Sequence, residues 1–167
     1  MDEDNFTIFY KQTFPHLWAY VFRVTQDRSL ADEIAQESFV RLLQEGTKGR
    51  EFTNQRSYVF AIASNLMREY WRRSMRFEEL PVEEQDVPSV IKNEDVDTRI
   101  DFAESYKKLS DMQRALLWLA YVERCDHSEI AGMLNLKKNS VRVLLYRARE
   151  KMQALLMRGG LKGEAKA

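Results

Sequence analysis

Residues 126–151 read DHSEIAGMLNLKKNSVRVLLYRAREK, and this stretch decides the fold. The pattern predicts a short helix over residues 127–134, a turn over residues 135–138 and a second helix that starts at Asn139 or Ser140. Two short helices joined by such a turn form a helix-turn-helix, whose second helix binds the major groove of duplex DNA. The stretch therefore indicates a DNA-binding module.

Single residues in this stretch suit the bends that the motif requires. Asn135 can adopt the left-handed conformation that ends the first helix, and Ser140 can cap the second. Leu136 can fill the angle between the helices, and Ala131 is small where they approach each other. These residue types support the helix-turn-helix prediction.

The second helix of the motif has two different faces. Apolar residues at spacings of three and four form one face, namely Val141, Leu145, Ala148 and Met152. Cations and a ring form the other: Arg142, Tyr146 and Arg149, flanked by Arg147 and Lys151. Guanidinium groups on this face could contact phosphates and guanine edges. The alternative is that the arginines only solvate an exposed helix.

The amino-terminal part of the chain is also predicted to be helical, because glycine and proline are scarce and stand where helices should end. Residues 6–24 carry apolar side chains at helical spacing, with Pro15 marking a break or a kink. A second helix is expected from Ser29 or Asp32 to Gly46.

Two further helical regions follow along the chain. One is expected from Arg56 or Ser57 to about Met75. The other opens near Ser105 and has a buried side within residues 109–120. No strand pattern interrupts these segments, so the sequence predicts an all-α protein.

Charge is distributed unevenly, although the net charge of the 167 residues is zero. Residues 1–76 hold 11 Lys and Arg against 10 Asp and Glu, or +1; residues 77–104 hold 2 against 10, or −8; residues 105–167 hold 13 against 6, or +7. We therefore predict two small helical domains, an amino-terminal bundle (1–76) and a carboxy-terminal helix-turn-helix domain (105–167), joined by a flexible acidic linker (77–104).

Composition excludes several classes of protein. No apolar run approaches the roughly 20 residues that cross a bilayer, and the acidic start is unlike a secretory signal, so we expect a cytoplasmic protein without membrane insertion. One cysteine, Cys125, cannot form an internal disulfide. With only His16 and His127 beside it, we expect no metal site and no cofactor.

The stretch LSDMQRALLWLAYVERCDHSEIAGMLNLKKNSVRVLLYRAREKM, residues 109–152, resembles the carboxy-terminal promoter-binding domain of extracytoplasmic-function (group IV) sigma factors. The resemblance implies that this domain contacts the −35 promoter element. It assigns that contact to Lys138, Ser140, Arg142, Tyr146, Arg147 and Arg149. Val143 and Leu144 depart from the family, which commonly has a small polar residue and an arginine there.

A second segment, ADEIAQESFVRLL at residues 31–43, resembles the family's helix that docks on the coiled-coil clamp of the largest polymerase subunit. On a helix, its carboxylates and amide surround an aromatic ring and suit a partner helix that carries arginines. The predicted polymerase contacts are Asp32, Glu33, Gln36, Glu37 and Phe39. The alternative is that Phe39 is core and the carboxylates are plain surface.

A third segment, RSYVFAIASNLMREYWRRSMR at residues 56–76, resembles the family's segment that recognises and melts the −10 element. Its arginines could hold the DNA backbone while its rings accept unstacked bases. By position, Phe52 and Asn65 resemble the family's pocket for a base flipped out of the non-template strand. The predicted −10 contacts are Phe52, Asn65, Arg68, Trp71, Arg72 and Arg73. The alternative is that each aromatic residue is core.

The resemblance covers nearly the whole chain, and the order of its segments is specific to the family. It implies a sigma factor that binds core RNA polymerase, directs promoter recognition and melting, and is not an enzyme. The implied partners are core polymerase, duplex and melted promoter DNA, and an anti-sigma factor. The protein would be cytoplasmic, and nucleoid-associated when it is bound to polymerase.

Two other functions were weighed against this one. A helix-turn-helix regulator that acts without polymerase would share residues 126–151 but would leave residues 31–43 unexplained. A hydrolase that uses Cys125 and His127 would need a third group to orient the imidazole, and none is evident.

Overall fold

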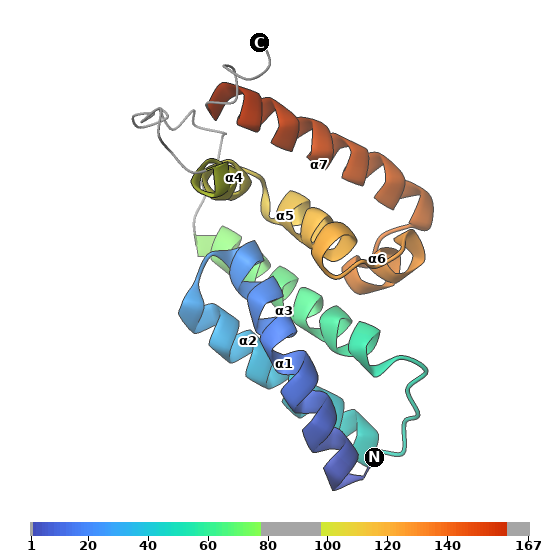
Figure 1. The fold of residues 1–167 in the computed structure, drawn as a ribbon. Helices are drawn as coiled ribbons and strands as arrows, with labels where there is room; N and C mark the ends of the chain where they lie inside the picture. The colour runs from blue at the N-terminus through green and yellow to red at the C-terminus, as the bar shows by residue number, and fades with distance from the viewer. Residues whose placement is uncertain (1, 78–97, 160–167) are drawn as a thin grey trace.

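A computed structural model describes residues 2–77 and 98–159, and every regular element in these ranges is helical. The all-α fold class is therefore confirmed. The elements are α1 (Glu3–Thr25), α2 (Arg28–Thr47), α3 (Gln55–Phe77), α4 (Thr98–Lys107), α5 (Asp111–Leu117), the π-helix η1 (Trp118–Val122), α6 (His127–Leu134) and α7 (Lys138–Gly159). Figure 1 shows α1, α2 and α3 as one bundle and the later helices as a second group lying against it.

The amino-terminal bundle differs from the sequence prediction at its helix ends. Pro15 lies inside α1 and does not break it. Asp27, rather than Ser29 or Asp32, caps α2, because its carboxylate accepts a hydrogen bond from the Leu30 backbone N–H, 3.1 Å away. Helix α2 thus begins one residue earlier than the earliest predicted start.

The second group of helices begins earlier than predicted. Helix α4 starts at Thr98, so residues 98–104 of the predicted linker are helical. The rest of that linker, residues 78–97, lies outside the described residues. Helix α5 follows a capping box in which Ser110 and Gln113 satisfy each other's backbone N–H groups.

The helix-turn-helix forms as the sequence predicted, except at one cap. Helix α6 occupies residues 127–134, and Asn135 ends it in the left-handed conformation with φ of 55°. Helix α7 begins at Lys138, so Ser140 lies inside its first turn and the prediction that Ser140 caps it was wrong. The outer end of α6 is held by a capping box between Asp126 and Glu129.

A single hydrophobic core runs through both helix groups. Leu17 and Val21 of α1 belong to the same buried cluster as Leu116 and Leu119 of the second group. The α3 and α6 helices are also in direct contact. Sequence reasoning predicted two modules, and the structure adds that they pack on each other over shared apolar surface.

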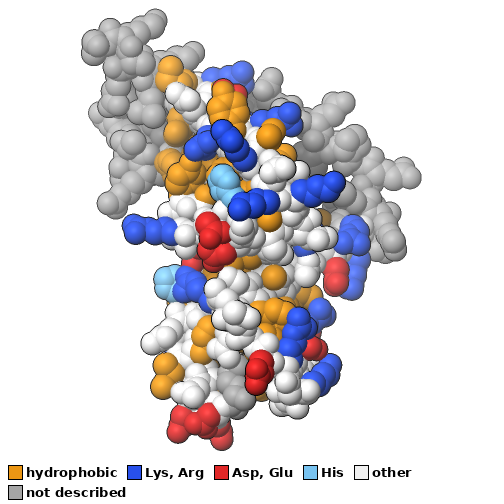
Figure 2. Space-filling model, turned by 90° about the vertical axis from the view of Figure 1, so that its right-hand side faces the viewer, with side chains coloured by type: hydrophobic (Ala, Val, Ile, Leu, Met, Phe, Trp, Pro, Cys, Tyr) orange, Lys and Arg blue, Asp and Glu red, His pale blue; other side chains and the backbone are white. Residues whose placement is uncertain are grey.

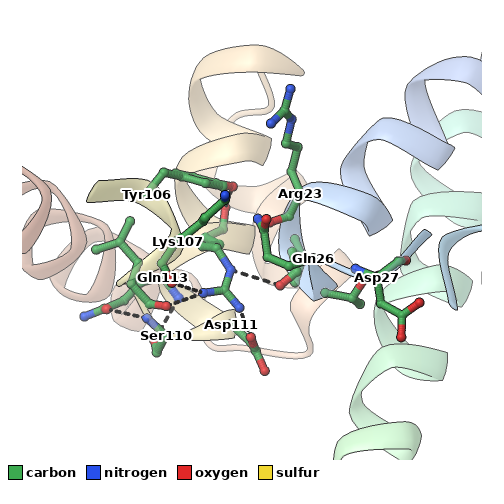
Figure 3. A network of polar contacts seen from close by, with 12 residues as sticks. Arg23, Gln26, Asp27, Tyr106, Lys107, Ser110, Asp111 and Gln113 are labelled. Atoms are coloured by element: carbon green, nitrogen blue, oxygen red, sulfur yellow. Dashed lines mark hydrogen bonds and ion pairs between the residues drawn. The ribbon is translucent and has the colours of Figure 1, made fainter. Parts of the chain in front are cut away.

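Arg114 ties the two groups together from inside. Its side chain is 7% exposed, and its guanidinium donates to the backbone oxygens of Val24, Lys107 and Leu109 and to the Asp111 carboxylate. Figure 3 shows this network bridging the end of α1 and the α4–α5 turn. Because every one of these acceptors faces one buried cation, the end of α1 and the start of α5 have a fixed spacing.

Within residues 2–77 and 98–159, no helix combines the length and the apolar character that a bilayer crossing requires. The same residues hold no cluster of three or more potential metal ligands.

Candidate polymerase and promoter interfaces

Helix α7 presents a cationic face to solvent. Val141, Leu145 and Ala148 are buried on its inner side, as predicted. Arg142 and Tyr146 are exposed on the outer side, Tyr146 by 54%. The α7 backbone thus holds the predicted outward face away from the core, and Figure 2 shows Lys and Arg side chains spread over the upper part of the molecule, which contains the helix-turn-helix.

Two outward residues of α7 are held by neighbours. The Tyr146 hydroxyl donates to the Glu150 carboxylate at 2.7 Å, and this bond raises the pKa of the phenol. The Arg149 guanidinium donates to the Tyr121 hydroxyl at 3.0 Å. Tyr121 comes from η1, and nothing in the sequence pattern singled it out as a partner of Arg149.

The remaining predicted −35 residues lie at or near the same surface. Lys138 at the start of α7 and Arg147 are exposed, whereas Ser140 is half-buried. Val143, one of the two departures from the family, points outward with 48% exposure. Leu144 is half-buried and packs against the core.

Helix α3 carries the predicted −10 residues. Arg72 and Arg73 are exposed, and Trp71 is half-buried against the core. The Arg68 guanidinium donates to the Asn65 side-chain oxygen and to the backbone oxygen of Leu134 in α6. Two predicted DNA contacts are therefore already engaged with each other, and one of them with the other domain.

A pocket of about 470 Å³ opens between the end of α2 and α3. Asn65 and Arg72, both predicted from sequence, lie in its wall. Phe52 stands beside it, with its ring centroid 4.7 Å from that of Tyr58. The full lining is Arg41, Gln44, Glu45, Arg50, Tyr58, Ile62, Asn65, Glu69 and Arg72.

Sequence reasoning missed the cation that stands over this pocket. The Arg50 guanidinium carbon lies 4.7 Å from the Tyr58 ring centroid and 6.0 Å from that of Phe52, which are cation–π distances. Arg50 also pairs with Glu45 at 3.5 Å. It sits in the connection between α2 and α3, where no helical periodicity marks a facing side chain.

The predicted docking residues of α2 divide into a surface set and a core residue. Asp32, Glu33 and Gln36 are exposed, and Glu37 is half-buried and pairs with Arg41 at 2.8 Å. This set forms a polar, largely acidic stripe along α2.

Phe39 is not on that stripe. It is 3% exposed and lies among the rings of Phe6, Phe9, Tyr10 and Phe14, with centroid separations of 4.9 to 6.4 Å. The prediction that Phe39 contacts the polymerase directly is therefore corrected. Burial favours the alternative, that Phe39 is a core residue that fixes α2 on α1.

Comparison with known proteins identifies the family. A family model for sigma-70 region 2 matches residues 9–77, and a model for sigma-70 region 4 matches residues 103–152. The first range contains the α2–α3 pocket and the second contains the helix-turn-helix, and together they cover well over half of the chain. This chain belongs to the extracytoplasmic-function (ECF) RNA polymerase sigma factors.

Relatives of this ECF sigma factor match it along most of its length. It is 22% identical to "ECF RNA polymerase sigma factor SigM" of Bacillus subtilis over 156 residues, which are 90% of this chain and 94% of that protein. It is 25% identical to "ECF RNA polymerase sigma factor SigL" of Mycobacterium tuberculosis over 151 residues, or 87% and 85% of the two chains. The fold resembles that of the sigma factor RpoE of Bartonella quintana, solved in complex with the anti-sigma factor NepR, with a TM-score of 0.70, 19% identity and coverage of 91% and 96%.

As an ECF sigma factor, the protein is a specificity subunit that directs RNA polymerase to promoter DNA at the start of transcription, and it is not an enzyme. The region 2 match accounts for residues 31–43, which a regulator acting without polymerase would leave unexplained. Burial also raises the pKa of the Cys125 thiol to about 11, opposite to the shift that activates a cysteine nucleophile.

Proposed function

We propose that this sigma factor opens promoters by holding one flipped base of the melted non-template strand in the pocket between α2 and α3. The pocket itself is the observation that carries the proposal. It has space for a planar ring, an aromatic side chain in Tyr58, and an amide in Asn65 that can pair with a base edge. A site that accepts only an extruded base converts binding free energy into strand separation.

The cations around the pocket suit the backbone of that strand. Arg72 and Arg73 are exposed on the same helix as Asn65, and Arg50 stands over the Tyr58 ring. Guanidinium groups beside a stacking ring are the combination that binds single-stranded nucleic acid. Trp71, half-buried, stacks less of its surface on DNA and serves mainly to seat this part of α3.

The acidic stripe of α2 serves as the docking surface for core polymerase. Asp32, Glu33, Gln36 and Glu37 offer carboxylates and an amide to a partner helix that carries arginines. Phe39 contributes from beneath, because its burial among the α1 rings sets the direction in which these side chains point.

Helix α7 reads the −35 element in this proposal. Arg142, Tyr146, Arg147 and Arg149 project from one surface, with Lys138 and Ser140 at its amino-terminal end. Val143, exposed among them, offers an apolar contact of the kind that recognises a thymine methyl group.

An anti-sigma factor is the expected regulator, and the protein acts in the cytoplasm with the polymerase. The structural neighbour RpoE was solved with an anti-sigma protein, and a free chain with these surfaces would compete for polymerase at all times.

A transcription assay with core polymerase tests the proposal. The chain should produce run-off transcripts from a promoter chosen by sequencing the transcripts that rise on overexpression. Asn65→Ala and Phe52→Ala should reduce permanganate-detected strand opening by about tenfold or more, because each removes a contact made only to the flipped base. Asn5→Ala, which removes an exposed amide at the far end of α1, is the matched control. Unchanged strand opening in both pocket variants would contradict the proposal.

A further inference from the structure

The contact between α3 and α6 joins the two domains through buried apolar surface. Ile130, Met133 and Leu134 of α6 are at most 3% exposed, and they belong to the same cluster as Val59 and Ala63 of α3. Surface of this kind is stable only while it stays covered, so the contact is a specific packing of one domain on the other.

Polar groups from α3 bind α6 and the loop before it. The Arg68 guanidinium donates to the Leu134 carbonyl, and Arg56 forms an ion pair with Glu123. The Ser57 hydroxyl adds a long hydrogen bond of 3.4 Å to Glu129. We call this set of contacts, with the apolar surface beneath it, the interdomain clasp.

We propose that the interdomain clasp is a self-inhibitory contact: in the free chain, α6 occupies Arg68 and, through it, Asn65, and so withholds both from promoter DNA. This inference rests on the proposed role of Asn65 and Arg68 in −10 binding. The Asn65 oxygen is needed for the flipped base, but Arg68 occupies it. A chain closed in this way must release Leu134 before Arg68 can bind a phosphate, so DNA and the interdomain clasp compete for one side chain.

Promoter geometry requires the interdomain clasp to open. The −35 and −10 elements are centred about 25 base pairs apart, and at about 3.4 Å per base pair they are separated by ~85 Å of duplex. While α6 packs directly on α3, the helix-turn-helix and the base pocket belong to one packed body with a shared core. The closed form can present α7 to a −35 element, because the outer face of α7 is exposed, but it cannot reach both elements together.

The charges in the interdomain clasp make the closed form easy to release. The Glu123 side chain is 2% exposed, yet its Oε1 atom has no hydrogen-bond partner among the described residues. His16 Nδ1 is 3.9 Å from that oxygen, too far for a hydrogen bond. Burying a carboxylate with one oxygen unsatisfied costs free energy that opening returns, since Glu123 and Arg56 then regain water.

A charge-swap experiment on the full chain tests the inference. Resonance energy transfer would be measured between dyes at exposed positions 48 and 153, one in each domain, in a Cys125→Ser background. The free chain should show high transfer. Glu123→Arg should lower transfer, because it places two cations together, and should tighten binding of a melted −10 strand by about tenfold, in proportion to the gain in open chains. The double swap Arg56→Glu with Glu123→Arg should restore high transfer.

Two variants guard this design against misfolding and general charge effects. Glu123→Gln keeps the shape of the side chain and should produce a smaller change in the same direction. Glu104→Arg makes the same charge change at an exposed position whose recorded partner is Lys107 in its own helix, and it should match the wild type.

Three results would overturn the inference: low transfer in the wild-type free chain, unchanged transfer in Glu123→Arg, or lower transfer without tighter strand binding. The run-off assay separates this inference from the proposed function. If no variant supports transcription with core polymerase while transfer and strand binding respond as expected, the proposed function fails and the interdomain clasp stands.

Discussion

The Trp18 indole nitrogen donates a hydrogen bond to the Asp32 carboxylate, with 2.7 Å between Nε1 and Oδ1. Trp18 belongs to α1 and also stacks on Phe22, with 5.1 Å between ring centroids. The first acidic residue of the docking stripe is therefore oriented by a neighbouring helix rather than by α2 alone. This relationship leads to a test of the docking surface that leaves every proposed contact residue in place.

Trp18→Phe should weaken binding to core polymerase by about fivefold, because an exposed carboxylate without its donor is worth about 1 kcal/mol less in a preorganised contact. Phenylalanine preserves the ring stacking on Phe22, so the helical circular dichroism should not change. Fluorescence anisotropy with core enzyme measures the affinity. Trp118→Phe is the matched control, because the buried Trp118 indole nitrogen has no hydrogen-bond partner among the described residues. Equal affinity in the two variants would refute a positioning role for Trp18.

Phe39→Ala should destabilise the protein by about 3–4 kcal/mol, as expected for loss of a buried ring that packs against several others. Asp32→Asn, on the exposed face of the same helix, should change stability by less than about 0.5 kcal/mol but should weaken polymerase binding. Urea unfolding and a polymerase pull-down, performed on both variants, separate the two roles. A fully stable Phe39→Ala chain would show that Phe39 is not a core residue.

Arg114→Met should cost about 3 kcal/mol of stability, because it removes a buried cation and leaves backbone oxygens of Val24 and Lys107 without their donor. Chemical denaturation of the full chain measures the loss. The comparison variant is Arg147→Met, an exposed arginine on α7, which should unfold at nearly the wild-type midpoint. If both substitutions have the same small effect, the network in Figure 3 contributes little to the stability of the fold.

Cys125 should react slowly with alkylating reagents at neutral pH. Burial, followed by the nearby Glu129 and Glu123 carboxylates, raises the pKa of its thiol from 9.0 to about 11. At pH 8 the thiolate should therefore be about a hundredfold scarcer than in the unfolded chain. Iodoacetamide rates measured across pH should rise towards an inflection near 11 in the native protein and near 9.0 in urea.

The same pKa shift sets a sign for stability. The unfolded thiol loses its proton at lower pH than the native one, so this group contributes stability that is complete below pH 9 and falls as the pH rises towards 11. Cys125→Ser should remove that alkaline dependence and should leave promoter opening intact. A native alkylation profile with an inflection near 9.0 would contradict the shift, and a large loss of opening in the serine variant would point to a chemical role for the thiol.

Local patterns predicted much of the fold because each depends on residues close together in the chain. The bounds of α6 and the left-handed Asn135 follow from a capping box and a turn that lie within ten residues. The inner face of α7 follows from helical periodicity. The start of α4 at Thr98 was missed because acidic residues surround it, and charge there masked the helical signal.

Site residues were predicted less evenly, for a physical reason. Asn65 and Arg72 were placed by their resemblance to a family segment, and both line the pocket. Phe39 was predicted on a docking face, although periodicity cannot say whether a ring next to a polar stripe is buried. Arg50 was missed because its position over Tyr58 depends on how the α2–α3 connection folds back.

The sequence by itself determined that the chain is helical, that a helix-turn-helix ends it and that polymerase-docking and DNA-melting segments precede it, since periodicity, caps and motif order are properties of neighbouring residues. Only the tertiary structure decided that Arg68 binds the Leu134 carbonyl, 66 positions away, and that Arg56 pairs with Glu123, 67 positions away. Partners at such separations depend on how helices pack, and shared apolar surface between α3 and α6 brings them together.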